Sequence, residues 1–225
     1  MSPESSCNTL SSAAVEFCAL ARRKLHATPS EAIFDPRTSA TWARGDFDLN
    51  PELLADHVMV EPPRPAAVLV PVVARDELTV LLTRRTENLS THAGQIAFPG
   101  GRMEDNDADA GATALREARE EIGLDPSFVE PLGFLDCYRS GTGFLITPLV
   151  ALVRPGFTLF LDPSEVADAF EVPLGFLMDP SHHHQHSREW HGRLRYYYAM
   201  PYGERYIWGA TAGMIKNMHE RLFVA

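Results

Sequence analysis

The sequence predicts an α/β fold, with a sheet covered by helices on two faces. Three observations lead to this prediction. Several short apolar runs have strand character, residues 109–122 show helical spacing of apolar side chains, and residues 209–222 repeat that spacing near the end of the chain. With 225 residues and 45 % hydrophobic content, the chain has enough apolar material for a real core.

The first sixty residues, 1–60, are expected to form a helical extension ahead of a main domain at 61–225. Residues 11–26 carry apolar side chains at helical spacing. This helix is expected either to pack on the domain or to make a subunit contact, so a homodimer is one expected assembly. Residues 29–65 are rich in proline and acidic side chains, which predicts an irregular connection with a short helix near 51–56.

The strands follow from apolar or β-rich runs in the main domain. Pro71 lies inside the first of them and cannot donate a ladder hydrogen bond, which predicts an edge position or a bulge there. The predicted strands are 66–73, 78–82, 94–98, 129–138 and 144–153, with a short one at 206–208.

The helix at 109–122 is predicted to have one packed side and one acidic side. Like charges at these spacings repel by roughly 0.2–0.5 kcal/mol per pair, and Arg116 can offset only part of that. Hard divalent ions prefer carboxylate oxygens, although a merely solvated helix face is the alternative. The packed side carries Gly111, Leu115, Ala118 and Ile122, and the opposite side carries Glu117, Glu120 and Glu121.

The surroundings of this helix favour the metal-binding alternative. Phe98, Pro99 and paired glycines end a strand-like run just upstream, where the backbone can approach a ligand closely. Gly123 stands where a C-terminal helix cap belongs. We therefore expect one or more Mg²⁺ or Mn²⁺ ions beside the glutamates.

Residues 116–124 resemble the second half of the box of the Nudix hydrolases, Arg-Glu-U-x-Glu-Glu-x-Gly-U, where U is aliphatic. Counting from Gly101, the first half departs from the pattern. Asp107 replaces a glutamate, and eight residues rather than seven separate it from Arg116. The resemblance implies an α/β/α sandwich with a mixed sheet. It also implies metal ligation by Glu117, Glu120, Glu121 and the Gly101 carbonyl.

Residues 81–101 look like the additional signature of the coenzyme A pyrophosphatase branch, and the similarity continues at 140–148, 165–174 and 207–212. This implies hydrolysis of CoA or acyl-CoA to 3′,5′-ADP and 4′-phosphopantetheine. Two alternatives stay open. One is hydrolysis of another nucleoside diphosphate derivative, such as ADP-ribose, a dinucleotide or an oxidised nucleotide, and the other is a sensor that binds nucleotide or CoA without turnover.

Three upstream residues are candidate substrate contacts. Arg85 follows a strand-like run, so its guanidinium would reach phosphate oxygens from a strand end. His92 would either donate to the same phosphates or hold its loop. Gln95 would either orient a substrate group or satisfy neighbouring backbone.

The implied chemistry is attack of water on phosphorus, with metal-bound water and a nearby base. Glu117 and Glu120 are catalytic candidates within the box, and Glu165 is a candidate base from a later loop. The alternative for Glu165 is a helix N-terminal acid, because residues 162–165 also look like the opening of a short helix.

Charge and composition exclude other classes. A formal charge of −10 argues against nucleic-acid or anionic-membrane binding, so the expected partner is a small-molecule diphosphate. Neither a spanning segment nor a secretion signal is apparent, and a cytoplasmic location is expected. The three cysteines predict reduced thiols. The histidine run at 182–186 is expected in an exposed loop, where it would bind Zn²⁺ or Ni²⁺ only adventitiously.

Overall fold

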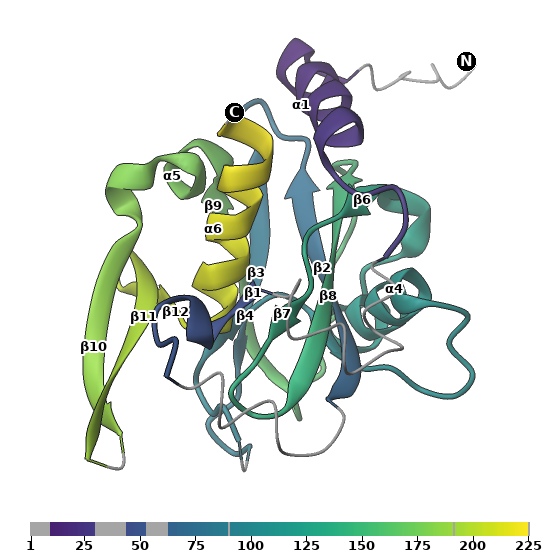
Figure 1. The fold of residues 1–225 in the computed structure, drawn as a ribbon. Coiled ribbons are helices and arrows are strands. Elements are labelled where there is room, and N and C mark those ends of the chain that lie inside the picture. Colours follow the sequence, from purple (N-terminus) through teal and green to yellow (C-terminus); the bar gives the residue numbers. More distant parts are fainter. Residues whose placement is uncertain (1–9, 30–43, 53–62, 90, 191, 225) are drawn as a thin grey trace, which may run out of the picture.

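The computed structural model describes residues 10–29, 44–52, 63–89, 91–190 and 192–224, and it confirms the α/β class (Figure 1). Its described strands form a nine-stranded mixed sheet and a separate three-stranded sheet. Strands β2 (Arg64–Val73) and β8 (Phe144–Val153) lie parallel at the centre and pair along their whole lengths. Both are almost continuously buried, as expected for central parallel strands.

The remaining elements pair around this centre. Strands β3 (Thr79–Arg85) and β5 (Gly100–Arg102) lie antiparallel to β2, and β4 (Ile96–Ala97) and β9 (Val166–Pro173) lie antiparallel to β3. Strands β6 (Val129–Phe134) and β7 (Tyr138–Arg139) pair with β8, and β1 (Arg44–Gly45) pairs with β7. The small sheet contains β10 (His184–Trp190), β11 (Arg193–Tyr202) and β12 (Arg205–Trp208). The helices are α1 (Ser12–Lys24), α4 (Ala110–Ile122), α5 (Leu174–Met178) and α6 (Ala210–Phe223), with single turns η2 (Asp46–Asp48), η3 (Pro126–Phe128) and η4 (Pro180–His182).

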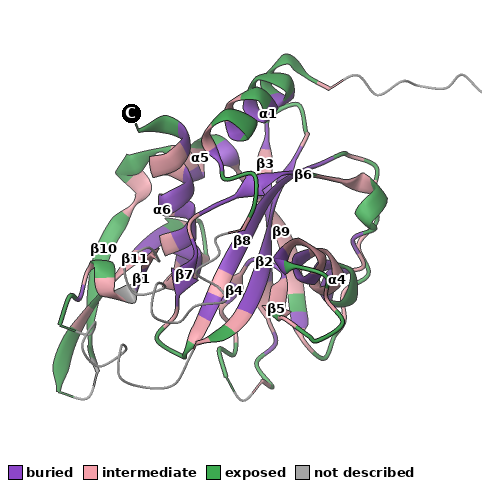
Figure 2. Ribbon diagram, turned by 45° about the vertical axis from the view of Figure 1, so that its right-hand side comes forward, coloured by how far each residue is buried: buried purple, intermediate pink, exposed green. Residues whose placement is uncertain are grey.

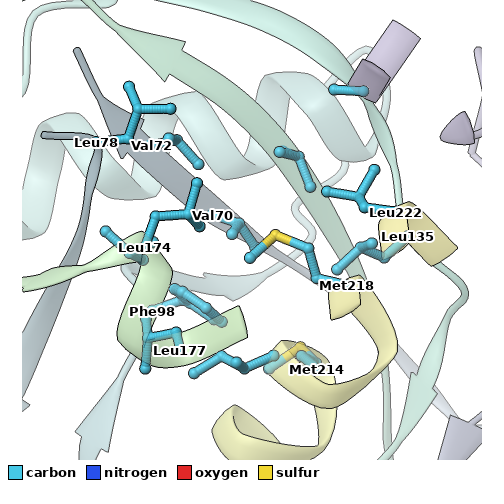
Figure 3. Packing of buried hydrophobic residues seen from close by; sticks show 14 of the residues in the cluster. Val70, Val72, Leu78, Phe98, Leu135, Leu174, Leu177, Met214, Met218 and Leu222 are labelled. Atoms are coloured by element: carbon cyan, nitrogen blue, oxygen red, sulfur yellow. The ribbon is translucent and has the colours of Figure 1, made fainter. Parts of the chain in front are cut away.

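Helices cover both faces of the large sheet, so most of the buried hydrophobic residues form two cores, and Cys137 and Leu145 form a small third cluster (Figure 2). The α6-side core also receives side chains from α1 and α5. Figure 3 shows Met218 of α6 pointing toward Val70 of β2, with Met214 on the side of Leu177 and Leu222 beside Leu135. The α4-side core joins that helix to the opposite faces of β2, β3 and β8.

The prediction of an edge position or a bulge at Pro71 is wrong. Pro71 lies in a central strand and is paired with Ala151 of β8, so it occupies neither an edge strand nor a bulge of that ladder. On its other side, β2 pairs with β5 through Ala66–Val68 and with β3 through Val72 and Val73. Pro71 falls between these two partners, where its missing N–H interrupts neither ladder.

The N-terminal helix packs on its own chain. Ser11 caps α1, and Ala14, Phe17, Cys18 and Ala21 are buried in the α6-side core. Further along, the side chain of Asn50 bonds to both the N–H and the C=O of Tyr196, at 2.8 Å each, and so pairs the part of β11 that β12 does not reach. The predicted helix at 51–56 lies mostly outside the described residues.

Other predictions needed adjustment. The predicted strand at 129–138 is broken into β6 and β7, whereas β8, β12 and α6 match their predicted positions closely. The histidine run does not form an exposed loop as expected. His182 ends a single turn, and β10 begins at His184. Cys18 and Cys137 are buried free thiols. Within the described part of the chain, no helix is long and apolar enough to cross a membrane.

Asp136 fastens α6 and the end of α1 to the sheet. Its carboxylate accepts from Asn217 Nδ2 at 2.8 Å and from Arg221 Nη1 at 2.9 Å, and His26 Nε2 lies 2.9 Å away. Burial alone would raise the pKa of Asp136, but these three partners more than offset burial and lower it. The ionised form is therefore the one that stabilises the fold.

We predict that Asp136→Asn lowers the free energy of unfolding by about 1–3 kcal/mol at neutral pH, because charge-assisted bonds are lost. Since the native pKa is depressed, the wild-type advantage is complete above the ordinary Asp value of about 3.9 and shrinks as the pH falls through the native value. Urea unfolding at several pH values measures this. The control is Glu130→Gln, which breaks an exposed pair with Arg22 and should change stability little. A loss that does not depend on pH would contradict this role for Asp136.

Candidate active site

Helix α4 has the predicted bounds but a different packed side. Asp109 caps its start by accepting from Ala112 N, and Gly123 ends it in the left-handed conformation, with φ of 66°. The side chains against the sheet are small, which brings the helix axis close to β2. They are Ala110, Ala114 and Ala118, with the larger Ile122 at the end of the helix; Ala118 and Ile122 match the prediction, whereas Gly111 and Leu115 are only partly buried.

The burial of Glu121 is the main consequence of this difference in the packed side of α4. This residue was predicted on the solvent side, yet it is 4 % exposed and lies under the turn into β5. There its Oε2 accepts from Gly100 N at 3.1 Å. Burial raises the pKa of Glu121 to about 7, and the Gly100 N–H and the charge of Arg85 counter this only in part. The three glutamates thus occupy three depths, with Glu120 60 % exposed and Glu117 between.

Gly101 lies directly against the Glu117 carboxylate. A Cβ built at this position would stand 2.5 Å from the carboxyl carbon of Glu117, so any side chain here would displace that carboxylate. The pairing of β5 with β2 fixes this approach, because Gly101 is in register with Ala67. The paired glycines and the glutamates of α4 therefore form one cluster, in which Gly101 lies against Glu117 and Gly100 N–H is bonded to Glu121.

Arg116 connects the acidic groups of this cluster. Its Nη1 donates to Glu117 Oε1 at 3.0 Å and to Glu120 Oε2 at 2.9 Å. Its Nε and Nη2 each donate to Asp107 at 2.9 Å. These bonds from Arg116 hold the pKa of Asp107 well below its ordinary value. Asp107 stands where the Nudix box has a glutamate, and it still supplies a carboxylate, which orients Arg116.

Arg85 lies at the end of β3, as predicted, and faces two carboxylates. Its Nη1 is 3.6 Å from Glu121 Oε1, and its Nη2 is 3.9 Å from Glu165 Oε2. Its Nε is buried and has no hydrogen-bond partner among the residues that the structure describes. Both ion pairs are long, so Arg85 retains donors for an additional anion.

Glu165 lies beside these groups on a turn. Asp162 accepts from Ser164 N at 2.8 Å, and Val166 then begins β9. The alternative of a helix at 162–165 is therefore wrong. The Glu165 side chain is 47 % exposed, and its charge helps to raise the pKa of Glu117 and Glu121.

His92 and Gln95 contact each other in the loop that follows β3. His92 has a positive φ of 57°, and its Nδ1 lies 2.9 Å from Gln95 Oε1. The Gln95 carbonyl accepts from Arg85 N at 2.9 Å, which ties the loop to the arginine. This pairing shows a loop-holding contact for both residues, and their contact with phosphate stays a prediction.

The described residues contain no group of three His, Cys, Asp or Glu side chains already placed to hold a metal ion. Arg116 engages Glu117 and Glu120, and Gly100 N–H engages Glu121. The donor chemistry nevertheless fits a hard divalent cation, because the candidate ligands are all oxygen. Burial first, and then the charges of Glu120 and Glu165, raise the pKa of Glu117 even though Arg116 opposes this. The site also holds more carboxylates than cations, because only Arg85 and Arg116 pair with its five acidic side chains: Asp107, Glu117, Glu120, Glu121 and Glu165.

Comparison with known proteins identifies the family. A NUDIX domain model matches residues 63–192. A protein of Photorhabdus laumondii described as an uncharacterized Nudix hydrolase NudL is 42 % identical over 161 residues, covering 72 % of this chain and 86 % of the relative. A NudL of Yersinia pestis is 39 % identical, covering 72 % and 81 %. A solved Ap4A hydrolase of C. elegans overlaps with a TM-score of 0.43 at 17 % identity, over 49 % of this chain and 80 % of that one. The chain belongs to the Nudix hydrolases, enzymes that split nucleoside diphosphate derivatives and generally use divalent metal ions.

Proposed function

We propose that this Nudix hydrolase cleaves the diphosphate of coenzyme A or acyl-CoA, giving 3′,5′-ADP and 4′-phosphopantetheine or its acylated form. The observation that carries the proposal is the position of the 81–101 signature. Its residues Arg85, His92 and Gln95 are joined to one another at the end of β3, directly opposite the carboxylates of α4. A diphosphate between them would meet cationic donors on one side and the metal ligands on the other.

We assign the ligands of Mg²⁺ or Mn²⁺ to Glu117, Glu120, Glu121 and the Gly101 carbonyl. A bound ion of this kind acidifies its water and neutralises charge on phosphate oxygens. For these ligands to share an ion, the Arg116 guanidinium must give up at least part of its contact with Glu117 and Glu120. Asp107 would keep Arg116 nearby while this happens, because it holds the Nε and Nη2 edge.

The protein side chains have distinct tasks in the proposed reaction. Arg85 binds a phosphate oxygen through the donors that its long ion pairs leave available. Glu165 is the more accessible of the two carboxylates that pair with Arg85, and it receives the proton of the attacking water. The loop that His92 and Gln95 hold keeps Arg85 in place and limits access of bulk water.

Incubation of the purified protein with a substrate panel tests the proposal. The panel contains CoA, acetyl-CoA, ADP-ribose, NADH and nucleoside triphosphates, each with Mg²⁺ or Mn²⁺, and mass spectrometry identifies the products. We expect 3′,5′-ADP and the phosphopantetheine product from the CoA compounds at the highest kcat/KM. CoA left intact while another compound is consumed would reject CoA as the substrate and leave the hydrolase assignment standing.

The exposed box glutamate gives a second prediction. Glu120→Gln should lower kcat by about 10²-fold or more, because it removes a charge that faces the metal. The fold should be unaffected, since Glu120 is mostly exposed. Steady-state kinetics and thermal unfolding measure the two effects. Glu204→Gln, in the exposed turn between β11 and β12, is the control and should match wild type. Near-wild-type turnover of Glu120→Gln would show that the ligands are misassigned.

The contact of Gly101 with Glu117 gives a third prediction. Gly101→Ala should weaken Mn²⁺ binding and lower turnover at least about tenfold, because the added methyl displaces the carboxylate that would hold the ion. Calorimetric titration with Mn²⁺ and steady-state kinetics give the two readouts. Gly175→Ala in α5 is the matched control, since its Cβ would meet nothing closer than 3.9 Å. Unchanged Mn²⁺ affinity in Gly101→Ala would contradict the assignment.

A further inference from the structure

Arg84 and Arg85 place positive charge on the two opposite faces of β3. Arg84 is in register with Ile96 of β4 and Asp168 of β9, and directly opposed residues of antiparallel strands share a face. Ile96 belongs to the α6-side core, so Arg84 lies on that face. Arg85 is in register with Val166, which belongs to the α4-side core. Arg85 therefore lies on the face of the sheet that carries the proposed diphosphate site.

An irregularity in β9 produces this separation. The register passes from Asp168 to Val166 between Arg84 and Arg85, which leaves Ala167 without an opposing residue. An extra residue of this kind reverses which face the following side chains occupy. Asp168 therefore shares a face with Arg84, although Val166, only two residues earlier, faces α4.

Arg205 of β12 neutralises Asp168 on this face. Its Nη1 lies 2.6 Å from Asp168 Oδ2, and its guanidinium stands over the Phe170 ring, 3.9 Å from the centroid. The ion pair and the ring fix Arg205 in position. Arg84, Arg205 and Asp168 together thus carry one excess positive charge, in a chain whose formal charge is −10.

Arg84 itself is uncommitted. In the part of the chain that the structure describes, its guanidinium forms no ion pair and no side-chain hydrogen bond, and it is partly exposed. A guanidinium has five donors in a fixed fork that matches the oxygens of a phosphate. Because Arg205 already binds Asp168, the residue opposite Arg84 in β9, Arg84 is available to an anion from outside the protein.

We propose that Arg84, with Arg205 beside it, binds a phosphomonoester of the substrate on the α6-side face, while Arg85 and the α4 carboxylates hold the diphosphate on the other. This inference builds on the proposed function and refines it. The 3′-phosphate of CoA is such a group, and ADP-ribose and NADH lack one. Arg84 is thus a specificity residue, because the metal ligands act on the diphosphate that all these compounds share.

The first test compares CoA with dephospho-CoA, which lacks only the 3′-phosphate. For CoA, Arg84→Gln should lower kcat/KM about 10- to 100-fold, as expected for lost charge-assisted hydrogen bonds. For dephospho-CoA the same variant should stay within about twofold of wild type, and Arg84→Lys should recover part of the loss with CoA. Arg195→Gln, another partly exposed arginine of the described chain without an ion pair, is the control and should change neither value. Equal losses with both substrates, or no loss, would overturn the proposal.

The second test does not require turnover. Calorimetry measures binding of adenosine 3′,5′-bisphosphate and of AMP to the wild type and to Arg84→Gln. The wild type should prefer the bisphosphate by at least about tenfold, and the variant should lose that preference. If CoA is hydrolysed but the two nucleotides bind alike, the phosphomonoester site is rejected and the CoA substrate stands. If CoA is not hydrolysed but the preference for the bisphosphate over AMP depends on Arg84, the CoA substrate is rejected and the phosphomonoester site stands.

Discussion

A single guanidinium, that of Arg116, organises the acidic end of α4. It contacts Asp107, Glu117 and Glu120 at once, in a helix that also buries Glu121. Without a cation of this kind, carboxylates at such short spacing would repel one another and push the helix end away from the sheet. Arg116 therefore acts as a resident counter-ion. Its contacts keep the proposed metal ligands together and also occupy some of the oxygens that a metal would need.

The sheet brings the other half of the site to the same place. Strand β3 ends at Arg85, β5 carries the paired glycines, and β9 begins one residue after Glu165. The antiparallel pairings of β3 with β9 and of β5 with β2 make these three points meet at one end of the sheet, opposite α4. The same pairings set Arg84 on the reverse face. Alternation along one strand thus separates the groups proposed for the diphosphate and for the phosphomonoester.

Sequence periodicity predicted the elements that have one clear pattern. Helix α4 and strand β8 were placed almost residue for residue, because a capping glycine and a continuous apolar run mark them. The burial of Glu121 was not predicted, since it follows from the close approach of small alanines to β2 and from the Gly100 N–H. Strands β9 and β10 were missed because polar and charged residues interrupt their pattern. The proposed role of Arg84 depends on the unpaired Ala167 of β9, a strand that is next to β3 in the sheet but far from it in the chain, so no local pattern reveals it.

A crystal structure with Mn²⁺, located by its anomalous scattering, would show directly whether these glutamates bind the metal. We expect one ion or more bound by Glu117, Glu120 and Glu121 with the Gly101 carbonyl, and an Arg116 guanidinium that stays on Asp107 but has moved away from Glu117. An ion found elsewhere, or Arg116 still bound to Glu117 and Glu120 at saturating Mn²⁺, would contradict this expectation.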